Sequence, residues 1–69
     1  MIEVFKTNVQ GKRQADSLVT ELKKHFPASR INIDMHDRDK VLRLEGTDFR
    51  IEMVRLLVEQ NGFYCSLLD

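Results

Sequence analysis

The sequence predicts an α+β domain of the ferredoxin-like class, a βαββαβ chain whose four-stranded antiparallel sheet carries two helices on one face. Three observations lead to this prediction. Four short segments alternate apolar and polar residues, which is typical of strands. Two longer segments place apolar residues at helical spacing, and the six segments follow one another as strand, helix, strand, strand, helix, strand. Right-handed crossovers then favour two βαβ units in one sheet, with the strand order 4-1-3-2.

The first third of the chain is expected to form a strand, a loop and a helix. Residues 2–7 alternate, and we expect Ile2 and Val4 to face the core while Phe5 faces the opposite side of the sheet. Residues 8–11 form the loop. The helix ends before Pro27, which lacks the backbone N–H needed to continue it. Its apolar stripe consists of Ala15, Leu18, Val19, Leu22 and Phe26.

A hairpin is expected next. Ile31, Ile33 and Met35 alternate with polar residues in its first strand, and Leu42 and Leu44 do so in its second. Residues 36–40 between them are polar and typical of a turn. The side chains of His36, Asp37 and Asp39 could hold a divalent cation weakly. Arg38 and Lys40 interleave with them, which favours a plain solvated turn.

The second helix and the last strand complete the pattern. Thr47 or Asp48 is expected to cap the helix at its start, and Gly62 to terminate it. The inner stripe of this helix is predicted to contain Ile51, Val54, Leu57, Val58 and Asn61. In the final strand, residues 63–68, the inward set is Phe63, Cys65 and Leu67.

Length and composition limit the classes of function. The 69 residues suffice for one small domain, residues 1–69, with a thin core. Eleven basic residues balance eleven acidic ones, which argues against nucleic acid or an anionic membrane as the default partner. A single cysteine forms no internal disulfide, no apolar run approaches a membrane span, and the first residues do not resemble a signal peptide. We therefore expect a cytoplasmic protein.

With these elements placed, the chain resembles the heavy-metal-associated domain over nearly its whole length. This is the fold of small copper chaperones and of the N-terminal modules of metal-transporting ATPases. The family carries Met-x-Cys-x-x-Cys after its first strand; here Lys6 stands in place of the Met, and Asn8 and Gly11 stand in place of the two Cys. The family's second-helix pattern Leu-x-x-Ala-Ile-x-x-x-Gly-Tyr corresponds to Val54, Leu57, Val58, Gly62 and Phe63.

The substitutions in the loop remove the chemistry that the family uses. Cu(I) prefers thiolate ligands, whereas the amide oxygen of Asn8 is a hard, weak donor and Gly11 offers no side chain. Lys6 adds a positive charge beside the place that a cation would occupy. The resemblance therefore implies the fold without the copper site. We interpret the loop as a metal site that was lost or never acquired, and we expect no cofactor.

The sequence also argues against an enzyme. It contains no Ser-His-Asp or Cys-His arrangement at a plausible spacing. Cys65 is expected to be a buried structural cysteine, because free cysteine is among the most buried residue types. His25 and His36 end different elements and lack a second ligand at metal spacing, so they are expected to be solvated surface residues.

A basic helix face is the predicted contact surface for a partner. Lys12 and Arg13 begin the first helix, where positive charge opposes the helix dipole, and Lys23 and Lys24 extend the same sign along it. Family chaperones dock acidic partners through a similar face, so the resemblance implies an acidic protein partner. Phe63 is expected to approach the loop at this end of the fold.

Two other functions stay open alongside this one. The sheet face away from the helices is expected to show Phe5, Tyr64 and Leu68, with Phe5 and Tyr64 paired across adjacent strands. Aromatic residues on such a face bind single-stranded RNA in other domains, although the third strand offers none here. The other alternative is a metal-handling protein that uses unconventional ligands. The favoured interpretation is a small non-enzymatic interaction module, whose partner and oligomeric state the sequence does not name.

Overall fold

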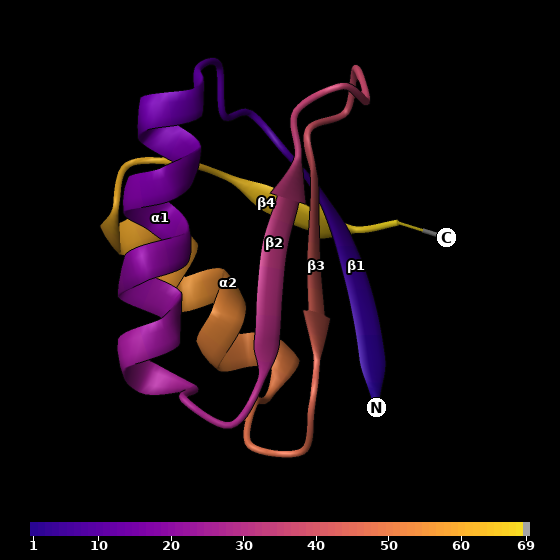
Figure 1. The fold of residues 1–69 in the computed structure, drawn as a ribbon, viewed down its shortest axis with the longest axis vertical. Coiled ribbons are helices and arrows are strands. Elements are labelled where there is room, and N and C mark those ends of the chain that lie inside the picture. Colours follow the sequence, from indigo (N-terminus) through magenta and orange to yellow (C-terminus); the bar gives the residue numbers. More distant parts are fainter. Residues whose placement is uncertain (69) are drawn as a thin grey trace.

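The computed structural model describes residues 1–68, which form two layers: a twisted sheet and a pair of helices packed on one of its faces (Figure 1). The elements are β1 (Ile2–Thr7), α1 (Lys12–His25), β2 (Arg30–Asp34), β3 (Val41–Glu45), α2 (Ile51–Gln60) and β4 (Cys65–Leu67). The strand order is β2-β3-β1-β4 and every neighbouring pair is antiparallel. This is the predicted order read from the opposite edge, so the predicted ferredoxin-like fold is confirmed.

Helix α1 buries the stripe that its sequence predicts. Ala15, Leu18, Leu22 and Phe26 are buried, and Val19 is half-buried at the edge of the stripe. The helix ends at His25, and the N–H of Phe26 donates to the carbonyl of Leu22 before Pro27 interrupts the pattern. The stripe packs on β2 and β3, where Ile31, Leu42 and Leu44 are buried as predicted.

The predicted facing of β1 is wrong. Phe5 is 0% exposed in the core, whereas Ile2 is 51% exposed and Val4 is half-buried on the opposite face. The cause lies in β3: Phe5 is the antiparallel partner of Leu42, and residues directly opposite each other share a face of the sheet. Burying Leu42 therefore turns Phe5 inward, and the large aromatic ring gains more from burial than a valine would.

Two core residues come from segments that look like polar loops. Val9 is buried in the β1–α1 loop, and Phe49 is buried just before α2. The ring of Phe49 packs edge-on against Phe26, with 6.4 Å between the ring centroids. The core therefore extends past the helices and strands into the two connections that follow β1 and β3.

Helix α2 begins later and differently than predicted. Its first residue is Ile51, preceded by Arg50, which makes no side-chain capping bond. Asp48 instead reaches across to the α1–β2 connection, where its carboxylate accepts hydrogen bonds from the N–H of Ala28 and the hydroxyl of Ser29. Ser29 lies so close to Gly46 that a Cβ on residue 46 would clash with its hydroxyl and Cα.

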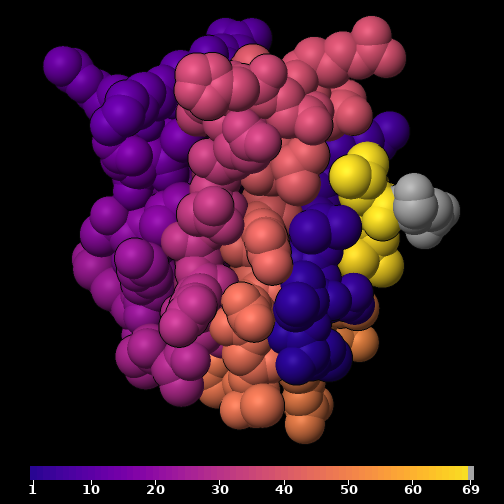
Figure 2. Space-filling model, turned by 45° about the vertical axis from the view of Figure 1, so that its right-hand side comes forward, coloured from indigo at the N-terminus to yellow at the C-terminus, as the bar shows by residue number. Residues whose placement is uncertain are grey.

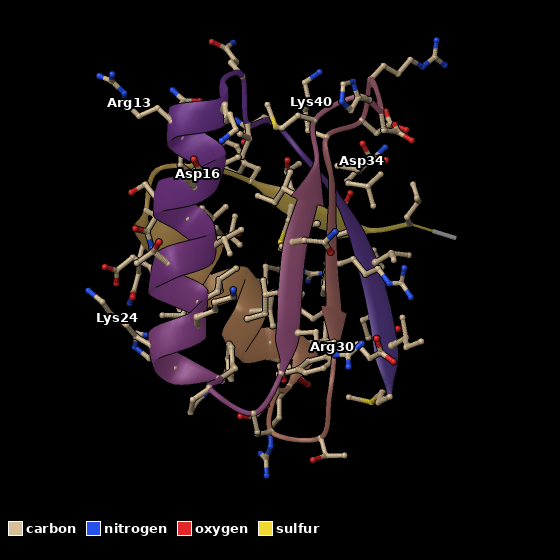
Figure 3. The ribbon with its side chains drawn as sticks, in the orientation of Figure 1. Arg13, Asp16, Lys24, Arg30, Asp34 and Lys40 are labelled. Carbon is tan, nitrogen blue, oxygen red and sulfur yellow. The ribbon has the colours of Figure 1, made fainter. Side chains whose placement is uncertain are left out.

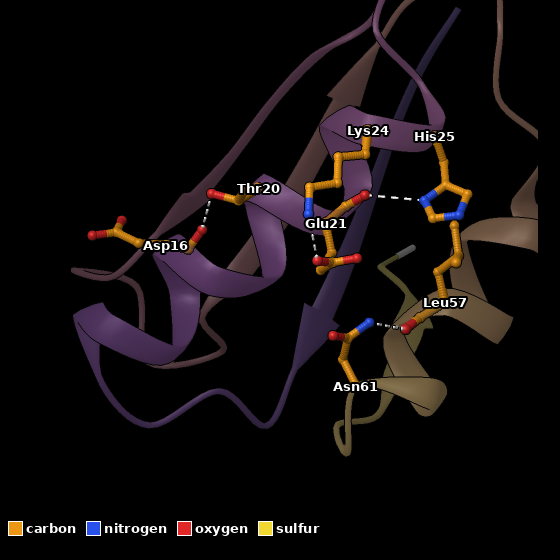
Figure 4. Close-up of polar contacts among 7 residues, drawn as sticks. All are labelled: Asp16, Thr20, Glu21, Lys24, His25, Leu57 and Asn61. Carbon is orange, nitrogen blue, oxygen red and sulfur yellow. Dashed lines mark hydrogen bonds and ion pairs between the residues drawn. The ribbon is translucent and has the colours of Figure 1, made fainter.

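The end of α2 follows the prediction in part. Gly62 has a positive φ of 89°, the conformation expected of a helix-terminating glycine. Val54, Leu57 and Val58 are buried, but Asn61 is exposed and not part of the stripe. Its side-chain amide donates to the carbonyl of Leu57 at 2.7 Å and so satisfies one open carbonyl at the helix end (Figure 4).

Candidate functional site

The loop that follows β1 is held at its start and in its middle. Thr7 donates from its backbone N–H to the carbonyl of Asp39 (3.0 Å) and from its hydroxyl to the carbonyl of Lys40 (2.7 Å). These bonds attach the end of β1 to the β2–β3 hairpin. The buried side chain of Val9 anchors the middle of the loop in the core. The loop is thus a firmly placed segment.

Asn8, which the sequence resemblance aligned with a copper-binding cysteine, forms a hydrogen bond to a segment near the other end of the chain. Its side-chain oxygen accepts a 2.7 Å hydrogen bond from the backbone N–H of Tyr64. Tyr64 itself is 70% exposed and precedes β4. The two residues line one shallow groove together with Lys6, Thr7, Cys65 and Ser66. Sequence reasoning did not associate Tyr64 with the loop, because the two lie far apart in the chain.

Gly11, which the sequence resemblance aligned with the second copper-binding cysteine, is the N-cap of α1 and supplies no side-chain capping bond. The side-chain oxygen of Gln14 accepts a hydrogen bond from the N–H of Gln10 at 3.0 Å, which ties the loop to the first turn of the helix. A Cβ built on Gly11 meets no heavy atom within 4 Å, and its φ of −135° suits any residue. The loop therefore has room for a side chain at this position.

The groove beside the loop offers one soft donor. Cys65 is half-buried and packs against the core, so it is less buried than predicted. Desolvation raises the pKa of its thiol, and Glu59 acts in the same direction while Arg55 opposes it. Within residues 1–68 no three His, Cys, Asp or Glu side chains gather where they could hold a metal ion.

The four cations of α1 form two rows. Lys12 and Lys23 are eleven residues apart, which is three helical turns, and both line a groove between α1 and β2. Arg13 and Lys24 have the same spacing one residue further around the helix, and Figure 3 shows both pointing away from the sheet. The predicted basic face therefore consists of two parallel rows of cations on α1.

Each row has one cation paired with a neighbouring acid. Lys12 lies 3.4 Å from Asp16, and Lys24 lies 3.1 Å from Glu21 (Figure 4). These are exposed pairs within one helix, worth a few tenths of a kcal/mol each at most. Among residues 1–68, Arg13 and Lys23 have no carboxylate within ion-pair distance. Of the four α1 cations, these two are the ones left open to an external anion.

Phe63 and the hairpin turn are the remaining predicted sites. Phe63 is half-buried and packs against the core, so only part of its ring is exposed. In the hairpin, the carboxylates of Asp34 and Asp37 accept hydrogen bonds from the N–H groups of His36 and Asp39. Turn formation engages these oxygens, as expected of a plain polar turn.

The open face of the sheet lacks the expected aromatic pair. Phe5 is in the core, and Tyr64 lies outside β4, so the two are not cross-strand partners; Phe5 pairs with Leu67 instead. Figure 2 shows β2, β3, β1 and residues 65–68 side by side on this face. Its apolar members are Ile2, Val4, Val41 and Leu68, none of which can stack on a base. The face therefore lacks the Phe5–Tyr64 pair on which the RNA-binding alternative was based.

Comparison with known proteins relates the chain to a fold class and to one copper-handling domain. No protein-family model matches the chain, and no curated protein sequence matches it significantly. A solved structure does match: the yeast copper transporter domain Ccc2A, determined in solution in its apo and Cu(I)-loaded states. The TM-score is 0.82 with 11% sequence identity, over 99% of this chain and 94% of that one. The likeness establishes the shared fold.

One further property concerns membranes. No helix within residues 1–68 has the length and apolar character needed to cross a bilayer.

Proposed function

We propose that this chain is a small, non-enzymatic interaction module that uses a metallochaperone-like fold without the copper ligands. Its surface for an acidic protein partner consists of the β1–α1 loop and the exposed cations of α1, in the cytoplasm and with no cofactor. The observation that carries the proposal is the pair of unopposed cations, Arg13 and Lys23, on a helix adjoining a firmly held loop. The fold shared with the copper transporter domain supports it.

The position of Lys12 and Arg13 supports a binding role beyond stability. Both lie in the first turn of α1, which contains no acidic residue. Positive charge at this end of a helix is unfavourable by roughly 0.3–1 kcal/mol per charge. Only Lys12 has a nearby carboxylate that relieves this cost. These charges destabilise the helix slightly, but they would attract an acidic partner and speed its association.

Charge reversal tests the proposal. We would immobilise the wild-type chain, the variant Lys12→Glu/Arg13→Glu, and the control Arg38→Glu, which reverses an exposed charge in the hairpin. Each would be probed with an oligo-glutamate peptide and with a cell lysate. Binding of the peptide and of specific lysate proteins should be lost with the double variant, kept with Arg38→Glu, and weakened by salt. Capture that survives the double reversal would refute the proposed surface.

The shared fold also keeps a second function open, namely metal handling through unconventional ligands. In that case the groove containing Asn8, Tyr64 and Cys65 would supply the ligands. A Cu(I) titration, described in the Discussion, separates the two functions, because the interaction module needs no metal.

A further inference from the structure

Strand β2 is one edge of the sheet, and its free side carries unpaired backbone groups. The N–H of Gly46 donates to the carbonyl of Met1, which shows that residues 42, 44 and 46 point their backbone groups toward β1. Antiparallel ladders alternate, so residues 41, 43 and 45 point toward β2 and bond residues 34, 32 and 30. The N–H and C=O groups of Ile31 and Ile33 therefore point outward from the edge.

This edge lacks three of the devices that block pairing with another strand, namely proline, lysine and a bulge, although it is short. Proteins protect edges with proline, bulges, lysines within the strand or a covering segment. Residues 30–34 contain no proline and no lysine, and their register with β3 runs without a bulge. Two donors and two acceptors are thus available to another strand on each molecule.

The sequence of β2 is complementary to itself in charge. It reads Arg30, Ile31, Asn32, Ile33, Asp34, with opposite charges at equal distances from the central Asn32. Within residues 1–68 neither Arg30 nor Asp34 forms an ion pair, although one carboxylate oxygen of Asp34 accepts the N–H of His36. Figure 3 shows Arg30 and Asp34 near opposite ends of the strand.

We propose that a second copy of this chain pairs with the β2 edge, antiparallel and about a two-fold axis at Asn32, so that two four-stranded sheets become one. Arg30 then lies opposite Asp34 of the second copy, and Ile31 lies opposite Ile33 of the second copy. Each molecule's outward N–H and C=O groups at residues 31 and 33 find partners. The contact is isologous and closed, as in most homodimers.

A second copy fits this edge better than an unrelated acidic strand does. An acidic strand would complement Arg30 but would place like charge opposite Asp34, and directly opposed like charges are destabilising. The flank of α1 beside the edge carries Lys12 and Lys23 with Asp16 between them. This flank is net positive on both copies and opposes the contact slightly, so the complementarity resides in the strand. A contact limited to one short strand is small, and we expect a weak dimer.

The test uses two single charge reversals and their mixture. Arg30→Asp places Asp opposite Asp34, and Asp34→Arg places Arg opposite Arg30, so each variant alone repels its own copy. Sedimentation velocity from about 10 μM to about 1 mM should show wild-type dimerisation, with the apparent Kd of each variant raised by about tenfold or more. An equimolar mixture of the two variants should restore dimers, because each residue then opposes its complement. Arg43→Asp, on the central strand β3, should dimerise like wild type.

A cross-link tests the register independently. Asn32 occupies a non-hydrogen-bonded position of the proposed pair, where opposed Cα atoms lie about 4.5 Å apart, within reach of a disulfide. In a Cys65→Ser background, Asn32→Cys should oxidise to a covalent dimer and Arg43→Cys should not. A wild-type chain that stays monomeric throughout would overturn the proposal. So would a mixture that fails to form heterodimers, or an Asn32→Cys variant that stays monomeric on oxidation.

Discussion

The side-chain oxygen of Asn8 accepts a 2.7 Å hydrogen bond from the backbone N–H of Tyr64. This bond closes the β1–α1 loop onto the segment that leads into β4. Asn8 therefore holds together two parts of the chain that lie far apart in the sequence. A hydrogen bond of this kind stabilises a fold by about 0.5–1.5 kcal/mol.

The loop is predicted not to capture Cu(I). Asn8 and Gly11 supply no thiolate, and Cys65 alone cannot form the two-sulfur site that a soft metal prefers. In a titration against a strong Cu(I) chelator, the wild-type chain should leave the metal on the chelator. Stoichiometric capture with shifts of loop resonances would contradict this prediction and favour the metal-handling function.

Restoring the two cysteines is predicted to create a copper site. Gly11 has open space for a side chain, and the buried Val9 should keep the loop in place. We expect Asn8→Cys/Gly11→Cys in a Cys65→Ser background to compete with the chelator, at a small cost in stability from the lost bond to Tyr64. Asn8→Ser/Gly11→Ser is the matched control. Absence of binding would show that the loop differs in shape from a copper-binding loop.

Cys65 is predicted to react slowly with a thiol reagent in the native protein. Its thiol is half-buried, and desolvation raises its pKa, so less thiolate is present at neutral pH than in the unfolded chain. Labelling at pH 7 should be several-fold slower than in denaturant and should accelerate as the pH rises. Tyr64→Cys in a Cys65→Ser background is the exposed control. Equal rates in native and unfolded protein would contradict the half-buried position.

Truncating Phe5 is predicted to destabilise the domain far more than truncating Val4. Phe5 is fully buried opposite Leu42, so Phe5→Ala should cost about 3–5 kcal/mol, enough to unfold a domain of this size. Phe5→Leu is a milder variant, expected to cost about 1 kcal/mol. Val4→Ala, on the open face, should cost less than either in denaturant unfolding. A larger loss of stability from Val4→Ala than from Phe5→Ala would show that Val4, and not Phe5, faces the core.

The bond from Ser29 to Asp48 is predicted to make stability depend on acid pH. The hydrogen bond from the Ser29 hydroxyl is the main cause that lowers the pKa of Asp48, with the N–H of Ala28 adding to it. A carboxyl whose folded pKa is lowered contributes stability above its unfolded pKa, about 4, and loses it as the pH falls through the folded value. Asp48→Asn should therefore be less stable than wild type at pH 7.

The difference in stability between wild type and Asp48→Asn should shrink as the pH falls below about 4, because protonation removes the advantage of the charged carboxylate. Ser29→Ala should reduce this acid dependence in the same way, and Asp16→Asn, an exposed acid on α1, should leave it largely unchanged. The measurement is the free energy of unfolding by urea across the pH range. An Asp48→Asn deficit that persists undiminished in acid would rule out the electrostatic origin.

Much of the fold was predictable because apolar residues at helical spacing define a single buried face of the helix. The stripe from Ala15 to Phe26 can face only one way on a helix, and Pro27 and Gly62 mark ends for stated backbone reasons. The candidate site was predictable as a location, since the loop follows β1 and adjoins α1. Its contacts were not, because the partner of Asn8 lies at the other end of the chain.

By itself the sequence determined the order of the elements, the strand order, the burial of one face of α1 and the absence of a cysteine pair in the loop. These follow from local spacing, crossover handedness and residue chemistry. Only the tertiary structure decided which face of β1 is buried. The alternation of residues fits either face, and the pairing of Phe5 with the buried Leu42 on β3 selects one of them. It also decided that Asp48 binds Ser29 instead of capping α2, because the two lie close only after the sheet forms. The open edge at β2 likewise exists only once β3 has taken the other side.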